Sequence, residues 1–233
     1  MTSFFLKIFA LIFMVIDHVG FILFPGEIIF RAIGRLAFPL FAYQMAVGFS
    51  HTRNKPKHIL KLLLFAILCQ IPQSIINNMY NIDHMLNIIF TFIFALLIIY
   101  VFENLKWFKN NNDSNKRIFD FKNSILSTSI AIVLLCLGIF LNVDYGWYGI
   151  LLTIAFYFTL NKKALGILLF FLLVNLNFII KQSQMAFLAY ISLFDIIFII
   201  LFNGKRGYKF SWIFYAFYFL HQFPLLFIKY YLI

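Results

Sequence analysis

The sequence contains few charged residues and very few acidic ones. Only eight of its 233 residues are Asp or Glu and only 12% are charged, whereas 64% are hydrophobic. A soluble domain is about one quarter charged and about half apolar. The shortage of charge therefore excludes an ordinary soluble enzyme and predicts a polytopic membrane protein.

Several motifs that carry well-known chemistry are also absent. The chain contains no H-E-x-x-H pair and no cysteine pair with metal-ligand spacing, so no metal site is predicted. It has neither a G-x-S-x-G nucleophile motif nor a phosphate-binding P-loop, which leaves a serine or P-loop mechanism unsupported. The two cysteines, Cys69 and Cys136, fall inside apolar runs, and we interpret both as packing residues.

Long hydrophobic runs fill the sequence instead. They predict an all-α bundle of about nine transmembrane helices that forms one membrane-embedded domain, residues 1–233. The apolar segments cover residues 3–24, 29–50, 57–76, 84–104, 124–142, 146–160, 163–180, 184–202 and 210–232. No A-x-A-like cleavage site follows the first segment, so we expect a retained helix there rather than a signal peptide.

The positive charges lie mainly on one side of the predicted bundle. Of the 19 Lys and Arg residues, all but four fall near the N-terminus or at the breaks after the second, fourth, sixth and eighth segments. The positive-inside rule then places the N-terminus in the cytoplasm and the C-terminus outside the cell membrane. The only extended polar loop, at about residues 105–123, is cytoplasmic in this arrangement. Membrane orientation thus explains the net charge of +11, and no nucleic-acid partner is expected.

Ionisable residues inside the first two segments are the main candidates for a functional site. Asp17 and His18 are adjacent, and Arg31 and Arg35 lie one helical turn apart. Each such group costs about 2.5–3.5 kcal/mol at a helix centre, so a cluster of them indicates function by default. The helical rise places Asp17 and Arg35 at the same depth, about 21 Å from the inner face. We expect Asp17, His18 and Arg35 to meet, although an ion pair that merely locks two helices together is the structural alternative.

Three later residues extend the predicted polar site. Asp195 and His221 both fall near mid-depth in sequential segments, so they are positioned to form an Asp–His pair. His221 can equally be a packing histidine. Asp144 falls at an outer turn, where it can contribute to the site or simply cap a helix.

Seven motifs follow one another along nearly the whole chain. The first three are L-K-I-x-A-x-x-x-M-x-I-D-H-x-G, R-x-I-G-R-x-A-F-P-x-F-A and G-F-x-H-T, which begin at Leu6, Arg31 and Gly48. The others are FAILCQIP, DYGWYGILL, LFNGKRGYK and FYFLH, which begin at Phe65, Asp144, Leu201 and Phe217. This series resembles the TraX family of membrane acyltransferases, which are named for the conjugative pilin N-acetylase. The family usually has a proline where this chain has Phe219.

The Asp-His pair followed by F-P-x-F is also similar, more distantly, to the wider superfamily of transmembrane acyltransferases. The resemblance implies that cytoplasmic acetyl-CoA is the co-substrate and that the acceptor lies beyond the membrane. Residue by residue, it implies a working centre and a supporting set. The working centre contains Asp17, His18 and Arg35, and the supporting candidates are Arg31, Asp144 and His221.

The predicted mechanism combines this resemblance with the chemistry of the residues. Acetyl-CoA docks from the cytoplasm, where basic side chains attract its phosphates. These side chains are Lys55, Lys57, Lys205 and Arg206. His18 removes a proton from an acceptor amine or hydroxyl while Asp17 orients the imidazole. Arg35 either pairs with Asp17 or binds the oxyanion, and the acceptor is a pilin N-terminus, a glycan or a peptide of the cell surface.

Two other functions fit the same residues. A proton-coupled transporter or flippase would use Asp17, His18 and Asp195 as a relay. A structural membrane subunit would engage every polar group in a bond between helices. Transfer of label from acetyl-CoA separates both of these from the acyltransferase.

Overall fold

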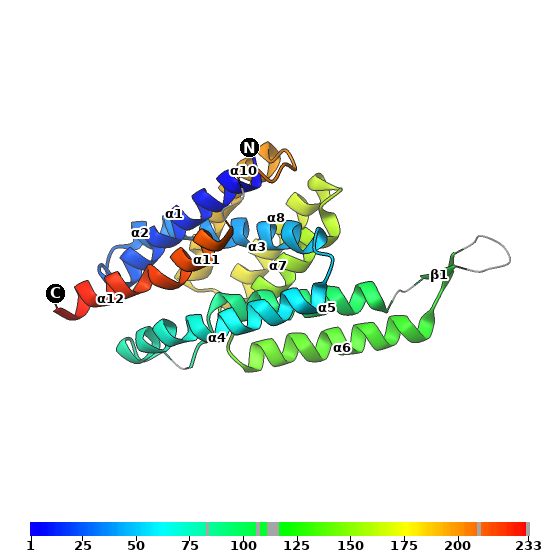
Figure 1. Ribbon diagram of the computed structural model, residues 1–233, viewed down its shortest axis with the longest axis horizontal. Helices are drawn as coiled ribbons and strands as arrows, with labels where there is room; N and C mark the ends of the chain where they lie inside the picture. Colours follow the sequence, from blue (N-terminus) through cyan, green and yellow to red (C-terminus); the bar gives the residue numbers. More distant parts are fainter. Residues whose placement is uncertain (83, 106–107, 111–116, 209–210, 232–233) are drawn as a thin grey trace.

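The computed structural model shows a bundle of helices packed side by side, with one short β-hairpin at its edge (Figure 1). It describes residues 1–82, 84–105, 108–110, 117–208 and 211–231. The first elements are α1 (Ser3–Ile22), α2 (Ile28–Gly34), α3 (Ala37–Ser50), α4 (Lys55–Met79), α5 (Ile88–Asn104), β1 (Phe108–Asn110), β2 (Arg117–Phe119) and α6 (Phe121–Phe140). The later elements are α7 (Gly146–Thr159), α8 (Lys163–Lys181), α9 (Gln184–Leu188), the 3-10 helix η1 (Ala189–Phe194), α10 (Asp195–Leu201), α11 (Ser211–Leu220) and α12 (Gln222–Tyr231).

Each predicted apolar segment corresponds to one helix or to consecutive helices, which confirms the all-helical class. In the part of the chain that the structure describes, six helices or runs of consecutive helices are long and apolar enough to cross a membrane. They are Ser3–Ile22, Ile28–Ser50, Lys55–Met79, Phe121–Phe140, Lys163–Lys181 and Gln184–Leu201. Helices α5 and α7 are apolar but shorter, and the last segment is divided into α11 and α12. Nine spans and the orientation of the termini stay predictions.

The predicted polar loop at residues 105–123 contains the β-hairpin, in which β1 pairs antiparallel with β2. Part of this loop, residues 106–107 and 111–116, lies outside the described residues, as does Lys209 at the end of the LFNGKRGYK motif. The hairpin extends away from the bundle beyond the ends of α5 and α6 (Figure 1).

Three helix breaks fall next to ionisable residues. Arg35 lies between α2 and α3, Asp195 lies where η1 changes into α10, and His221 lies between α11 and α12. Pro39 and Pro224 occupy the first turns of α3 and α12, where the missing proline N–H removes no intrahelical hydrogen bond. The prolines therefore explain why two of these segments are broken beside Arg35 and His221.

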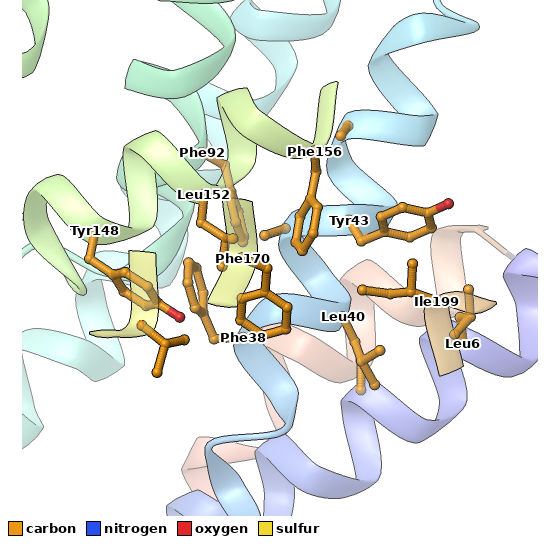
Figure 2. Close-up of a cluster of buried hydrophobic side chains, with 14 of the residues drawn as sticks. Leu6, Phe38, Leu40, Tyr43, Phe92, Tyr148, Leu152, Phe156, Phe170 and Ile199 are labelled. Carbon is orange, nitrogen blue, oxygen red and sulfur yellow. The ribbon is translucent and has the colours of Figure 1, made fainter. Parts of the chain in front are cut away.

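Helix α3 lies at the centre of the core (Figure 2). Phe38 stacks on Phe92 of α5 with ring centroids 6.0 Å apart, and Tyr43 meets the edge of Phe156 of α7 at 5.4 Å. Leu40 is fully buried. Close packing of this kind is the main force that joins helices in lipid, where no hydrophobic effect drives them together. Arg35 immediately precedes this helix, so its backbone is held by the best-packed part of the bundle.

Helix α6 lies at the periphery of the bundle and exposes large apolar side chains (Figure 1). Phe140 is 84% exposed, and Ile132 and Val133 are each 56% exposed. A contiguous apolar surface is rare on a soluble monomer but suits contact with lipid.

Candidate functional site

Two histidines from opposite ends of the chain form a largely buried pair. Nδ1 of His18, in α1, lies 2.7 Å from Nε2 of His221, and the ring centroids are 4.9 Å apart. His221 is only 8% exposed, and its Nδ1 lies 3.2 Å from the carbonyl oxygen of Phe217. The structure therefore brings together two predicted site residues that the sequence interpretation had assigned to different partners.

Asp17 forms an ion pair with Arg31 rather than with Arg35. Nη1 of Arg31 donates to Oδ2 of Asp17 at 2.7 Å, and both side chains are less than one fifth exposed. The guanidinium of Arg31 also covers the ring of Phe21, 4.8 Å from its centroid. The alternative in which Arg35 pairs with Asp17 is wrong, because the chain bends at Arg35 and the side chain of Arg31 is the one that faces α1.

Two glycines allow α1 and α2 to approach closely enough for this ion pair. A Cβ atom at Gly34 would overlap the carboxylate of Asp17, and a Cβ atom at Gly20 would overlap the side chain of Phe30. A side chain at either position would therefore push the two helices apart.

Arg35 is directed towards α7 and α9. Its Nη1 lies 3.3 Å from the hydroxyl of Tyr145, its Nη2 lies 3.5 Å from the sulfur of Met185, and its guanidinium lies 5.6 Å from the centroid of the Tyr145 ring. Among the described residues, its Nε has no hydrogen-bond partner and no carboxylate pairs with it. The hydrogen bonds of Arg35 are thus to the neutral groups of Tyr145 and Met185, although the carboxylates of Asp17 and Asp144 are near enough to act on its charge.

Asp144 and Tyr145 form the turn that enters α7. Tyr145 has a left-handed backbone with φ of 60°, a strained conformation for a residue other than glycine. Its ring stacks on Phe38 at 4.0 Å, and its N–H donates to Oδ1 of Asp144 at 2.9 Å. Burial raises the pKa of the Asp144 carboxyl, and the nearby Arg35 guanidinium opposes that shift. The sequence interpretation did not single out Tyr145, although it lies between Asp144 and Gly146 in a motif that was recognised.

The predicted pair between Asp195 and His221 is wrong. Helix α10 packs on α3, whereas α12 packs on α1 and α4, so these sequential helices do not place the two residues together. Asp195 is fully buried, and neither of its carboxylate oxygens has a hydrogen-bond partner among the described residues.

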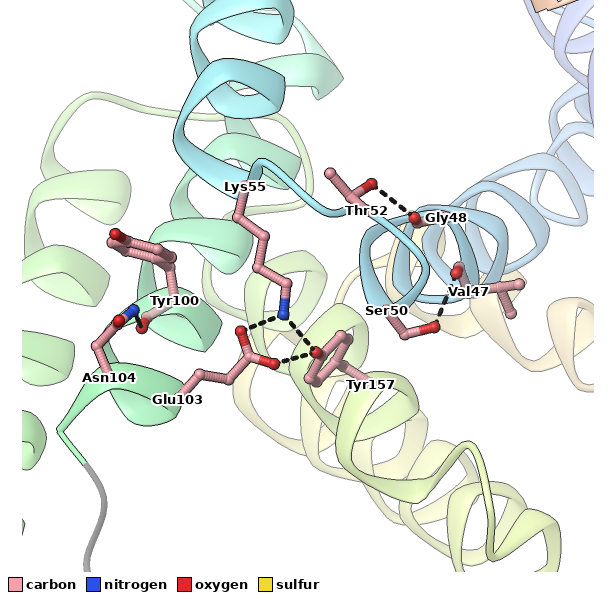
Figure 3. Close-up of polar contacts among 9 residues, drawn as sticks. All are labelled: Val47, Gly48, Ser50, Thr52, Lys55, Tyr100, Glu103, Asn104 and Tyr157. Atoms are coloured by element: carbon pink, nitrogen blue, oxygen red, sulfur yellow. Dashed lines mark hydrogen bonds and ion pairs between the residues drawn. The ribbon is translucent and has the colours of Figure 1, made fainter.

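Lys55 is engaged in a network between helices instead of being free for a ligand (Figure 3). Its ammonium donates to the carboxylate of Glu103 and, at 3.2 Å, to the hydroxyl of Tyr157. That hydroxyl in turn donates to Glu103. Lys55 therefore joins the start of α4 to α5 and α7.

The other three predicted phosphate-binding residues are exposed. Lys57 lies on the first turn of α4, and Lys205 and Arg206 lie in the loop after α10. The backbone carbonyls of Lys205 and Arg206 accept hydrogen bonds from Ser3 and Phe4, so this loop lies against the start of α1.

An apolar cavity of about 230 Å³ lies between α1, α3, α4, α5 and α11. We call it the apolar cavity. Apart from Lys7, Gln44 and His58, its walls are aliphatic, aromatic, methionine or glycine residues, and they include Tyr218. Gln44 is 5% exposed, and its carbonyl oxygen accepts from the hydroxyl of Ser3. The amide nitrogen of Gln44 and Nε2 of His58 have no partner among the described residues. Neither His18 nor His221 lines this cavity, but the ring of Tyr218 in its wall lies 5.8 Å from the ring of His221.

A second cavity, of about 350 Å³, lies between the turns that precede α7 and α9. We call it the charged cavity, because Arg35, Asp144 and Lys181 line it together with Tyr145 and Trp147. Gln44 and Tyr145 are two of the lining residues that the sequence interpretation did not single out. A lone amide inside an apolar run is the signal that could have revealed Gln44.

Three or more metal-ligating side chains do not come together anywhere in the described residues. The histidine pair itself also does not fit a shared metal ion. Two nitrogens bound to one tetrahedral zinc at about 2.0–2.1 Å would lie about 3.3 Å apart, whereas these nitrogens are 2.7 Å apart. That distance is typical of a hydrogen bond.

The fold and the site together define a helical protein with several candidate membrane spans and a polar cluster buried among them. The family model described as TraX protein matches residues 3–229, which is nearly the whole chain. The chain therefore belongs to the TraX family.

Two curated relatives match shorter regions. An uncharacterized protein of Rickettsia prowazekii is 32% identical over 99 residues, which cover 42% of this chain and 37% of that protein. A protein of Dichelobacter nodosus described as "Probable fimbrial assembly protein FimC, serogroup H1" is 36% identical over 73 residues, which cover 30% of each chain. The matched regions thus span about a third of the length of these relatives. No solved structure matches the chain.

Proposed function

We propose that this protein is a membrane acyltransferase that moves an acetyl or other acyl group from cytoplasmic acyl-CoA to an amine or hydroxyl beyond the cell membrane. Membership of the TraX family supports a transferase associated with pilin acetylation. The observation that carries the proposal is the largely buried histidine pair, in which His221 contacts Tyr218 of the wall of the apolar cavity. The charged cavity begins close by at Arg35, one helical turn beyond the Asp17–Arg31 ion pair.

The apolar cavity suits the pantetheine arm of the donor. That arm alternates apolar groups with amides, and the unpartnered amide nitrogen of Gln44 offers a donor to one of its carbonyl oxygens. Lys7 lines the same cavity, and Lys57, Lys205 and Arg206 are exposed cations suited to the phosphates of CoA. Lys55 is left out of this set because Glu103 already pairs with it.

The transfer step requires one base and one group that stabilises negative charge. His18 takes the proton from the acceptor nitrogen or oxygen as that atom attacks the thioester carbonyl. A bond from the acceptor to the carbonyl carbon forms, the carbon–sulfur bond breaks, and the thiolate of CoA receives the proton from His18. Arg35, which has no carboxylate partner among the described residues, binds the oxyanion that develops between these events.

Asp17 contributes through Arg31 in this mechanism. Their ion pair neutralises two charges at the contact between α1 and α2 and fixes the backbone that carries both His18 and Arg35. This differs from the role expected from the sequence, in which Asp17 bonds directly to the imidazole.

The charged cavity is the proposed acceptor site. It combines Arg35 and Lys181 with Asp144 and two aromatic side chains, which suits a polar acceptor group at a membrane surface. The fimbrial assembly protein among the relatives supports a pilin-like or other cell-surface acceptor.

A proton-coupled transporter is less well supported. Its relay would need Asp17, His18 and Asp195 to communicate, but the carboxylate of Asp195 has no polar partner among the described residues. The hydrogen bond of His18 connects it to His221 instead.

The test follows radiolabel from acetyl-CoA added to inside-out membrane vesicles that contain the protein. We expect label to accumulate in macromolecules of the vesicle lumen with the wild type and to fall to background with His18→Ala. His84→Ala is the matched control, because His84 is an exposed histidine outside both cavities. Both variants are checked for equal membrane insertion.

Labelling by His18→Ala at the wild-type rate would contradict the assignment of His18 as the base. Solute flux that depends on a proton gradient and needs no acyl donor would favour the transporter instead.

A further inference from the structure

The two ring nitrogens of His221 have different neighbours, and the difference determines where its proton lies. Nδ1 lies 3.2 Å from the backbone carbonyl oxygen of Phe217, and Nε2 lies 2.7 Å from Nδ1 of His18. A carbonyl oxygen can only accept a hydrogen bond, so Nδ1 of His221 carries the hydrogen. In the neutral ring, Nε2 then has a lone pair and is an acceptor.

The proton position of His18 follows from that of His221. Since Nε2 of His221 is an acceptor, Nδ1 of His18 must carry the hydrogen that joins the two rings. In neutral His18 the lone pair is therefore on Nε2. The reverse arrangement would place the lone pair of His221 Nδ1 against the carbonyl oxygen of Phe217, which gives repulsion in place of a hydrogen bond.

The surroundings hold the ring of His221 in the orientation that this chain of hydrogen bonds needs. Its ring is nearly parallel to that of Phe217, with an angle of 15° and centroids 5.9 Å apart. The ring of Tyr218 approaches it edge-on at 5.8 Å. The break between α11 and α12 at His221 allows the side chain to face α1 while its backbone N–H still bonds to Phe217.

We propose that His221 is a positioning residue that fixes the tautomer and ring plane of His18, so that Nε2 of His18 is the atom that removes the acceptor proton. This inference rests on the proposed function, in which His18 is the base, and it gives to His221 the orienting role expected of Asp17. When His18 binds a proton on Nε2, its Nδ1–H bond to His221 becomes charge-assisted and stabilises the imidazolium. Asp17 does not orient His18 directly, because its Oδ2 accepts from Arg31 and its Oδ1 has no hydrogen-bond partner among the described residues.

Three variants of His221 separate positioning from packing. Gln has a side-chain oxygen near the place of Nε2 and can accept from His18, whereas Leu fills similar space without an acceptor, and Ala does neither. We expect His221→Leu and His221→Ala to lower kcat for acetyl transfer about 100-fold with an unchanged KM for acetyl-CoA. His221→Gln should stay within about tenfold of the wild type.

A wild-type kcat for His221→Leu would overturn the proposal, as would a His221→Gln variant no more active than His221→Leu. Thermal unfolding of each variant in detergent accompanies the kinetics, so that a loss caused by misfolding is recognised. A packing role predicts that Leu is the better substitute, and the hydrogen-bond role predicts that Gln is.

A second measurement needs no acetyl transfer at all. In protein labelled with ¹⁵N-histidine, the nitrogen shifts report which ring nitrogen carries hydrogen, and the His18 signals are identified by their loss in His18→Ala. We expect neutral His18 with hydrogen on Nδ1 in the wild type and in His221→Gln, and a mixture of tautomers in His221→Leu. Hydrogen on Nε2 of His18 in the wild type would overturn the inference.

The two measurements distinguish failure of this inference from failure of the proposed function. If the protein transfers no acetyl group but His18 carries hydrogen on Nδ1 and loses this preference in His221→Leu, the hydrogen-bond chain holds and only the acyltransferase proposal fails. If transfer occurs and the preference is absent, the positioning role is wrong.

Discussion

The apolar cavity and the charged cavity share no lining residue, and they offer a ligand opposite chemistry. The walls of the apolar cavity carry a single unpartnered amide, that of Gln44, besides Lys7 and His58. The charged cavity is lined by Arg35, Asp144 and Lys181. The apolar cavity therefore suits a long, mostly apolar donor, whereas the charged cavity suits a short, polar acceptor.

The largest loss of acetyl transfer is expected on substitution of Arg35, in the charged cavity. We expect Arg35→Gln to lower acetyl transfer about 100-fold, because removal of one oxyanion-binding donor costs about that much. The KM for acetyl-CoA should not change, since Arg35 does not line the apolar cavity. Initial rates with labelled acetyl-CoA measure both quantities.

Lys181→Gln is the matched control for Arg35, because Lys181 is a second cation in the charged cavity but projects from α8. We expect its rate to stay within about threefold of the wild type, as an exposed charge is screened. Equal losses in the two variants would show that the cavity acts by net charge rather than through the guanidinium of Arg35.

A smaller effect is expected on substitution of Gln44, which lines the apolar cavity. Gln44→Leu removes a buried hydrogen-bond donor worth about 1–1.4 kcal/mol to a bound ligand, so the KM for acetyl-CoA should rise about five- to tenfold. The value of kcat should change little, because Gln44 bonds to Ser3 and to neither histidine of the pair. Met45→Leu is the control in the same cavity, and it should leave the KM within about twofold.

An unchanged KM in Gln44→Leu would mean that the donor does not occupy the apolar cavity. A lowered kcat without a change in KM would place Gln44 in the transfer step instead.

The smallest effect is expected at Asp195, which lines neither cavity. Its carboxylate is fully buried without a hydrogen-bond partner among the described residues, so Asp195→Asn should leave transfer within about twofold and should not lower the Tm. Transfer assays and thermal unfolding in detergent check this. A more than tenfold loss of transfer in Asp195→Asn would contradict this prediction and would favour the proton-relay function.

The sequence predicted the helices and most members of the polar site, but it did not predict which side chains would bond. Intramembrane charge revealed Asp17, His18 and Arg31, because a buried ionisable group is costly wherever it faces. Arg31 and Arg35 lie on the same helical face one turn apart, so only the break after α2 decides which of them reaches Asp17.

The wrong Asp195–His221 pairing has a different physical cause. It assumed that segments adjacent in sequence are adjacent in space. This holds for α1 and α2, but in the last two predicted segments α10 packs on α3 while α12 packs on α1 and α4. His221 instead contacts a residue of the first helix, and no local pattern encodes such a long-range contact. Depth along a helix can be read from sequence, whereas rotation about its axis is decided by packing.

The contact between α1 and α2 has a consequence for how this protein tolerates change. At Gly20 and Gly34 the two helices are separated by little more than backbone, and the carboxylate of Asp17 occupies the space that a methyl group at Gly34 would take. The volume of a substituting side chain, and not its polarity, therefore limits which residues these two positions accept. A single added carbon atom, with no change of charge anywhere, would displace one half of the Asp17–Arg31 ion pair from the other.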